Sequence, residues 1–101
     1  MYKRVQSPLM RLRSLAELTQ QQLADVVGVS ETTVRNWEKG RSTPTLAIDQ
    51  LRRFCYALGV KPKNLPLDIV ITGKISEVVG VLDEFDRLPD DLSPQPIQGH
   101  E

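Results

Sequence analysis

The chain has 101 residues with thirteen basic and thirteen acidic side chains, so its formal net charge is zero. This length predicts one domain with room for an appendage. A single cysteine excludes both an intrachain disulfide and a zinc site built from several cysteines. Since no apolar leader and no run near 18 apolar residues occurs, we expect a cytoplasmic protein without a membrane segment.

The neutral total hides a division of charge along the chain. Residues 1–64 carry eleven Lys and Arg against five Asp and Glu, a net +6. Residues 65–101 carry two against eight, a net −6. Local charge rather than total charge sets the attraction to phosphates, so the basic front part suits a nucleic-acid partner.

The first predicted helix covers residues 8–17. Ser7 is placed to cap it, and a proline in the first helical position has a backbone angle that suits a helix start. Its apolar spacing turns a row of leucines inward, with either Leu15 or Ala16 at the third position. The inward residues are Leu9, Leu12, Leu15 or Ala16, and Leu18.

Two short helices are predicted next, over residues 20–27 and 31–38. Thr19 and Gln22 have the spacing of a capping box, and Ser30 is placed to cap the second helix. Gly28 lies between them, where a tight turn usually needs a positive φ. Two helices joined by such a turn form a helix-turn-helix motif. The apolar residues that face inward are Leu23, Ala24, Val27, Val34 and Trp37.

The run LTQQQLADVVGVSETTVRNWEKG, residues 18–40, resembles the lambda-repressor/Cro (XRE-type) DNA-binding proteins. Counted from Gln20, the small residue Ala24 is fifth, Gly28 is ninth and Val34 is fifteenth, as in that family. The resemblance covers roughly residues 8–66. It implies an all-α, four- to five-helix domain whose third helix reads DNA. It further implies that Arg13 pairs with Glu38 at the end of that recognition helix.

Candidate DNA contacts follow from the outward face of this helix and from the resemblance. With Val34 and Trp37 inward, the side chains that face out are polar, and amide, hydroxyl and guanidinium groups suit base edges. Glu31 departs from the family's frequent glutamine, so we expect it either to accept from a cytosine or to pair with Arg35. The predicted base-reading residues are Gln20, Glu31, Thr32, Arg35 and Asn36, with Arg35 open to a phosphate instead. The predicted phosphate contacts are Gln22, Thr33, Lys39, Arg41 and Thr43.

Turn residues and apolar spacing predict the remaining elements. Gly40 should end the recognition helix, and a fourth helix should run over residues 45–58 with Cys55 as a small apolar core residue. One helical turn is expected near residues 62–65, then either a short strand or a linker at 68–72. An amphipathic helix is expected at 75–88. The predicted parts are a DNA-binding domain (1–66), a C-terminal extension (67–88) and a disordered tail (89–101).

These features predict a sequence-specific transcriptional regulator. The expected activity is that of a repressor, which binds a palindrome in double-stranded DNA as a homodimer through residues 67–88. The alternative is an antitoxin-type protein whose acidic extension binds a partner protein and orders only with it, while residues 1–66 autoregulate the operon. No nucleophile–base pair, metal cluster or phosphate loop occurs, so we expect no enzyme, cofactor or metal.

Overall fold

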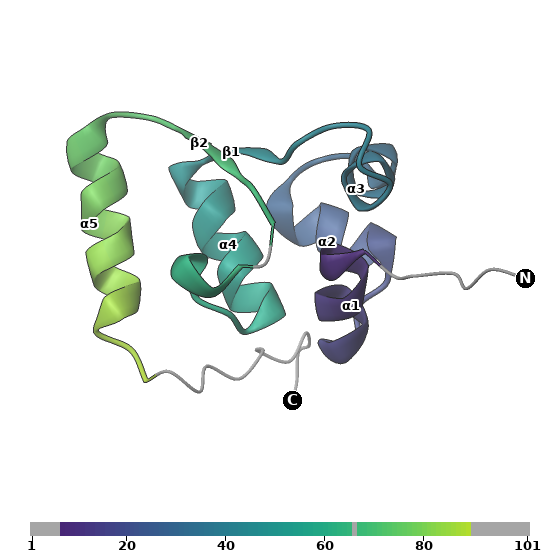
Figure 1. The fold of residues 1–101 in the computed structure, drawn as a ribbon, viewed down its shortest axis with the longest axis horizontal. Helices are drawn as coiled ribbons and strands as arrows, with labels where there is room; N and C mark the ends of the chain where they lie inside the picture. The colour runs from purple at the N-terminus through teal and green to yellow at the C-terminus, as the bar shows by residue number, and fades with distance from the viewer. Residues whose placement is uncertain (1–6, 66, 90–101) are drawn as a thin grey trace, which may run out of the picture.

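The computed structural model describes residues 7–65 and 67–89, which form five α-helices, one 3₁₀ turn and a two-stranded sheet (Figure 1). The predicted all-α class is confirmed, with the small sheet as an addition. The predicted tail lies outside the described residues except for Pro89. The elements in order are α1 (Pro8–Leu15), α2 (Gln20–Val27), α3 (Glu31–Glu38), β1 (Thr45–Ala47), α4 (Ile48–Leu58), η1 (Pro62–Asn64), β2 (Val70–Thr72) and α5 (Ile75–Asp86).

Helix α1 begins as predicted and ends two residues early. Ser7 Oγ accepts a hydrogen bond from the Met10 amide at 3.1 Å, which satisfies a backbone donor of the first turn. At the other end Glu17 takes a left-handed conformation with φ 61°, which a helix cannot continue through. Leu15 is 73% exposed and Ala16 is half-buried, so Ala16 occupies the inward position.

Helices α2 and α3 have the predicted boundaries. Thr19 Oγ1 accepts from the Gln22 amide at 3.0 Å, and Gln22 Oε1 accepts from the Thr19 amide at 2.9 Å, which completes the capping box. Gly28 ends α2 with φ 86°, a conformation that costs other residues energy. Ser30 Oγ accepts from the Thr33 amide at 3.1 Å and starts α3. Residues close in the sequence therefore set the ends of both helices.

Helix α4 runs through the centre of the core and contacts each of the first three helices. Phe54 is fully buried and meets Trp37 edge to face, with ring centroids 6.1 Å apart. Cys55 is also fully buried, and burial raises the pKa of its thiol to about 12. The thiol stays protonated at physiological pH, so the prediction that Cys55 is a small apolar core residue is confirmed.

The predicted start of the fourth helix at Thr45 is wrong. Residues 45–47 form β1, which pairs in parallel with β2 in the register Thr45–Val70 to Ala47–Thr72. Leu46 is fully buried between two exposed neighbours, the period-two pattern of a strand. Helix α4 begins only at Ile48, where the Gln50 side chain accepts from the Ala47 amide at 2.9 Å. The alternative left open at 68–72 is thereby decided for a strand at 70–72.

Helix α5 docks against α4 at the end of the molecule opposite to α1–α3, with α4 between them (Figure 1). Val81 and Phe85 are buried in this contact, and the Phe85 ring lies 4.9 Å from that of Tyr56. The buried Lys61 side chain donates to the Leu88 carbonyl at 2.6 Å, just beyond the C-terminal end of α5. A cation at this place interacts favourably with the negative end of the helix dipole. The C-terminal extension therefore shares a core with the preceding helices.

A polar cluster at the α4–α5 contact gives this docking a pH dependence. Arg52 pairs with Glu84 at 3.0 Å, and the Tyr56 hydroxyl donates to the same carboxylate at 3.4 Å. The hydrogen bonds from Arg52 lower the pKa of Glu84 below its ordinary 4.5. A carboxyl whose pKa is lower in the folded state stabilises the fold above its unfolded pKa, and this stability disappears as pH falls through the folded value.

We expect the Glu84→Gln variant to unfold at lower urea than the wild type at pH 7, because it lacks the ion pair with Arg52. The difference should shrink as pH falls below 4.5, where the carboxyl of the unfolded chain takes up its proton, until the pH has passed the lower pKa of the folded state. Urea titrations followed by circular dichroism at pH 7 and pH 3 measure both differences. A gap of equal size at the two pH values would contradict the assigned contact. Asp49→Asn, at the more exposed partner of Arg52, is the control and should change stability less.

Candidate nucleic-acid interface

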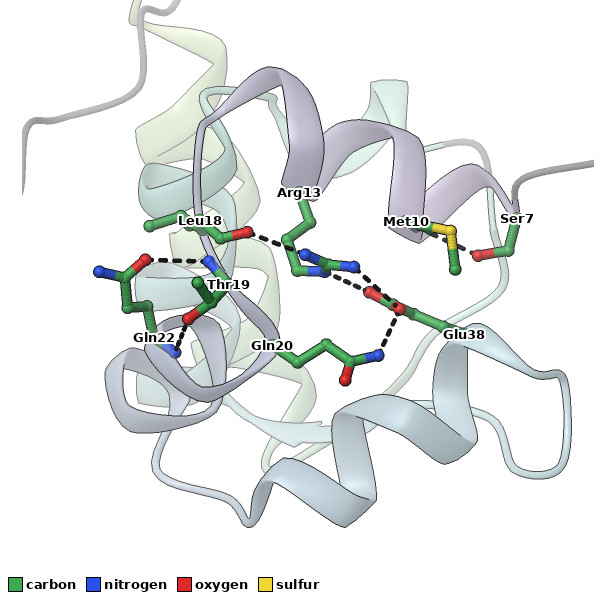
Figure 2. A network of polar contacts seen from close by, with 8 residues as sticks. All are labelled: Ser7, Met10, Arg13, Leu18, Thr19, Gln20, Gln22 and Glu38. Carbon is green, nitrogen blue, oxygen red and sulfur yellow. Dashed lines mark hydrogen bonds and ion pairs between the residues drawn. The ribbon is translucent and has the colours of Figure 1, made fainter.

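The last residue of α3 is tied to α1 and α2 by a buried carboxylate (Figure 2). The Glu38 side chain is 0% exposed and accepts from Arg13 Nε at 2.6 Å and from Arg13 Nη2 at 3.3 Å. Arg13 Nη1 also donates to the Leu18 carbonyl at 2.9 Å. The ion pair that the resemblance implied is therefore present. Because Glu38 is fully buried and Arg13 is mostly buried, their ion pair constrains the angle of α3 against α1.

Gln20, predicted to read bases, joins the same carboxylate. Its amide nitrogen donates to Glu38 Oε1 at 2.8 Å, from the first turn of α2 (Figure 2). Gln20 is half-buried and connects the start of α2 to the end of α3. This contact was not predicted. Because the amide nitrogen of Gln20 bonds to Glu38, the amide oxygen and the side-chain methylenes of Gln20 are held in one orientation. The interaction therefore orients Gln20 for any DNA contact.

The outward face of α3 is polar, and its inward face packs against the core. Val34 is fully buried, and Trp37 and Glu38 are less than a tenth exposed. Thr32 is exposed, while Arg35 and Asn36 are half-buried. These last three side chains belong to the predicted base-reading set and lie on the side of α3 that the core does not cover. The helix therefore offers hydroxyl, guanidinium and amide groups over a single face.

Glu31 and Arg35 form an ion pair one turn apart on this face. Arg35 Nη2 lies 3.6 Å from Glu31 Oε1, and both side chains are about two-fifths exposed. Pairing with Arg35 was one of the two alternatives expected for Glu31. The pair also partly neutralises the charge of the Glu31 carboxylate. An exposed pair of this kind contributes little stability, so its groups are free to exchange partners at low cost.

Three of the five predicted phosphate contacts lie at and just beyond the end of α3. Lys39, Arg41 and Thr43 follow the end of α3, and all three are exposed. They follow the helix closely because Gly40 takes φ 74° and the Arg41 amide bonds back to the Asn36 carbonyl at 2.9 Å, which ends α3 as predicted. The other two members have local roles.

Those two members, Gln22 and Thr33, are used in helix caps. Gln22 closes the capping box of α2, and Thr33 Oγ1 lies 2.9 Å from Ser30 Oγ. Both caps hold the first turn of a helix, and Gln22 is exposed while Thr33 is half-buried. Helix N-termini carry unpaired backbone N–H groups and the positive end of the dipole, so a phosphate at either cap would be favoured. The local roles leave the predicted contacts untested.

Among residues 7–65 and 67–89, no three His, Cys, Asp or Glu side chains are grouped as metal ligands. None of the helices in these ranges combines the length and apolar composition that crossing a bilayer requires.

Comparison with known proteins agrees with this geometry. The helix-turn-helix family model matches residues 9–62, more than half of the chain. Neither the curated proteins nor the solved structures yielded a match. The matched segment contains α2, α3 and α4, all of α1 except Pro8, and the Arg13–Glu38 pair. The chain therefore belongs to the helix-turn-helix family, with a lambda-repressor/Cro-type (XRE) DNA-binding domain, and is a DNA-binding transcriptional regulator.

Proposed function

We propose that this protein is a sequence-specific repressor that binds a palindromic DNA site as a homodimer, with α3 in the major groove. The observation that carries the proposal is the division of α3 into a buried face and a polar face. Glu38 and Trp37 hold the helix on its domain, and Thr32 and Asn36 lie away from it. A helix held in this way presents the same side chains to every site, which sequence discrimination requires.

The distribution of charged side chains also supports α3 as the helix that enters the DNA groove. Lys39 and Arg41 are exposed at the end of α3, where they can reach the backbone beside a groove that α3 occupies. Helix α5 carries four acidic side chains and no basic one, and it lies at the opposite end of the molecule from α3 (Figure 1). These four charges are thus kept away from DNA bound at α3, where local charge sets the attraction.

The docking of α5 favours this function over the antitoxin-type alternative. That alternative expects the acidic extension to order only with a partner protein. Phe85 is instead buried against α4 of the same chain, and Glu84 pairs with Arg52.

One small domain makes few base contacts, so a homodimer is the usual route to useful affinity and specificity. Repression then follows where such a site overlaps a promoter.

Selection of binding sites by the full chain from a pool of random duplexes tests this function. We expect enrichment of one inverted repeat, because two identical domains related by a two-fold axis read identical half-sites. Insertion of the selected site into a promoter should then lower transcription when the protein is present. Failure to enrich any sequence at low and at high salt would contradict sequence-specific binding. Enrichment of an asymmetric single site would contradict the palindrome.

A further inference from the structure

The loop of residues 41–44 joins the recognition helix α3 to β1, and hydrogen bonds to residues outside the loop fix both of its ends. At its start the Arg41 amide donates to the Asn36 carbonyl at 2.9 Å. At its end the Val70 amide of β2 donates to the carbonyl of the buried Pro44 at 2.8 Å. The three residues before Pro44 have exposed side chains. The loop is therefore anchored at both ends and open to solvent between them.

The pairing of β1 with β2 continues this anchor beyond the loop. Strand β1 follows Pro44 directly and pairs in parallel with β2 over its whole length (Figure 1). Leu46 of β1 is fully buried, and Ile71, its partner in β2, packs against the core. The Val70 side chain is 51% exposed, so Val70 holds the loop chiefly through its backbone amide. The far end of the loop is therefore fixed by the C-terminal extension.

We propose that β2 is a positioning element for DNA binding, which holds Arg41 and Thr43 against the DNA backbone through the bond from Val70 to Pro44. A residue that becomes ordered only on binding weakens affinity, and ordering the backbone of one residue corresponds to a factor of about 5–30 in an equilibrium constant. A loop that is already held is ordered during folding instead, so this loss of affinity is avoided. The proposal rests on the DNA-binding function proposed above and on the predicted phosphate contacts of Arg41 and Thr43.

This positioning role differs in its effect from the reading of bases by α3. Contacts to the sugar-phosphate backbone carry no sequence information of their own. Helix α3 is held by Glu38 through contacts that do not involve β2. A loosened loop should therefore weaken binding to every duplex alike and leave the base preference unchanged. It should also lower the slope of affinity against salt, because fewer phosphates are neutralised.

The first test is Val70→Pro in the full chain, because proline lacks the amide that donates to Pro44. We expect affinity for the selected and the shuffled duplex to fall alike, by about 5- to 30-fold, and the salt slope to fall by about one. Fluorescence anisotropy at several salt concentrations measures both. Val70→Ala shortens the same side chain but keeps the amide, so this matched control should bind as the wild type does. Proline is tolerated at the first residue of a strand, and circular dichroism checks that the fold persists.

A double-mutant cycle tests whether the loss passes through Arg41. Arg41→Ala should weaken binding less in the Val70→Pro chain than in the wild type, because the loosened loop no longer holds the guanidinium at its phosphate. Glu84→Gln lowers stability at a contact outside β2, so this control should leave the salt slope unchanged. Additive losses, or a Val70→Pro chain with the wild-type salt slope, would overturn the positioning role while binding to the selected site remains. A wild type that binds no duplex would overturn the proposed function as well.

Hydrogen exchange of the wild-type chain provides a test without any substitution, which also decides the question if Val70→Pro does not fold. Coupling between two equilibria is reciprocal, so a bond that favours the DNA-bound loop must itself be favoured by DNA. We expect the selected duplex to slow exchange of the Val70 amide more than exchange of the Val81 amide in α5, as measured by nuclear magnetic resonance. Equal slowing at the two amides, or no slowing at Val70, would overturn the proposal.

Discussion

Replacement of Glu38 with leucine is expected to lower the free energy of unfolding by about 3–5 kcal/mol, because it leaves the Arg13 guanidinium buried without its partner charge. The Glu38 side chain is 0% exposed and that of Arg13 is 14% exposed, so water can replace only a small part of the lost contact. Gln20 loses its acceptor in the same variant. Urea unfolding followed by circular dichroism measures the change.

Two further variants separate the charge from the packing. Arg13→Met combined with Glu38→Leu should recover most of the lost stability, since an apolar pair of similar volume needs no hydrogen bonds. Glu31→Ala, which breaks the exposed ion pair on the same helix, should cost less than about 1 kcal/mol. If Glu38→Leu lowered the free energy of unfolding no more than Glu31→Ala, the contacts of Glu38 with Arg13 and Gln20 would not be what holds α3 in place.

Replacement of Asn36 with alanine is expected to reduce affinity for the selected site by about 1–3 kcal/mol and to relax discrimination at one base pair. Arg41→Ala should instead weaken binding to all duplexes alike and lower the slope of affinity against salt by about one. The physical reason is that a side-chain amide reads a base edge, whereas an exposed guanidinium neutralises a phosphate. Fluorescence anisotropy with the selected and a shuffled duplex, at several salt concentrations, measures both effects.

The comparison of these two variants identifies which residue reads sequence. Equal losses for Asn36→Ala on the selected and shuffled duplexes would remove Asn36 from the base-reading set. A loss confined to the selected duplex for Arg41→Ala would move Arg41 into that set. Both side chains lie outside the core, so neither change should alter the urea midpoint by more than a small amount.

The helix-turn-helix motif could be predicted because its determinants are local. Caps and turns depend on residues within a few positions, as with Thr19 and Gln22 in the capping box, and Gly28 in the turn. The start of α4 was misplaced because residues 45–47 are held extended by β2, whose residues 70–72 are distant in the sequence. An apolar run that continues into a helical pattern does not reveal such a partner.

The sequence predicts which side of α3 faces solvent, but only some of the contacts between side chains at the candidate site. Val34 and Trp37 have helical spacing that assigns the opposite side of α3 to solvent. The bond between Gln20 and Glu38 joins two helices across eighteen positions, and no local pattern indicates it. Arg52–Glu84 and Lys61–Leu88 are of the same kind, so the docking of α5 could not be distinguished beforehand from partner binding.

Cleavage of DNA from a probe attached to α3 tests most directly that this helix enters the DNA. Cys55 is buried and its thiol has a pKa raised to about 12, so a cysteine introduced at Thr32 can be labelled selectively with an iron chelate. Glu77→Cys, exposed on α5, provides the control. We predict cuts within the selected half-sites from position 32 and no localised cuts from position 77. Localised cleavage from position 77, with none from position 32, would contradict the assignment of α3 as the recognition helix.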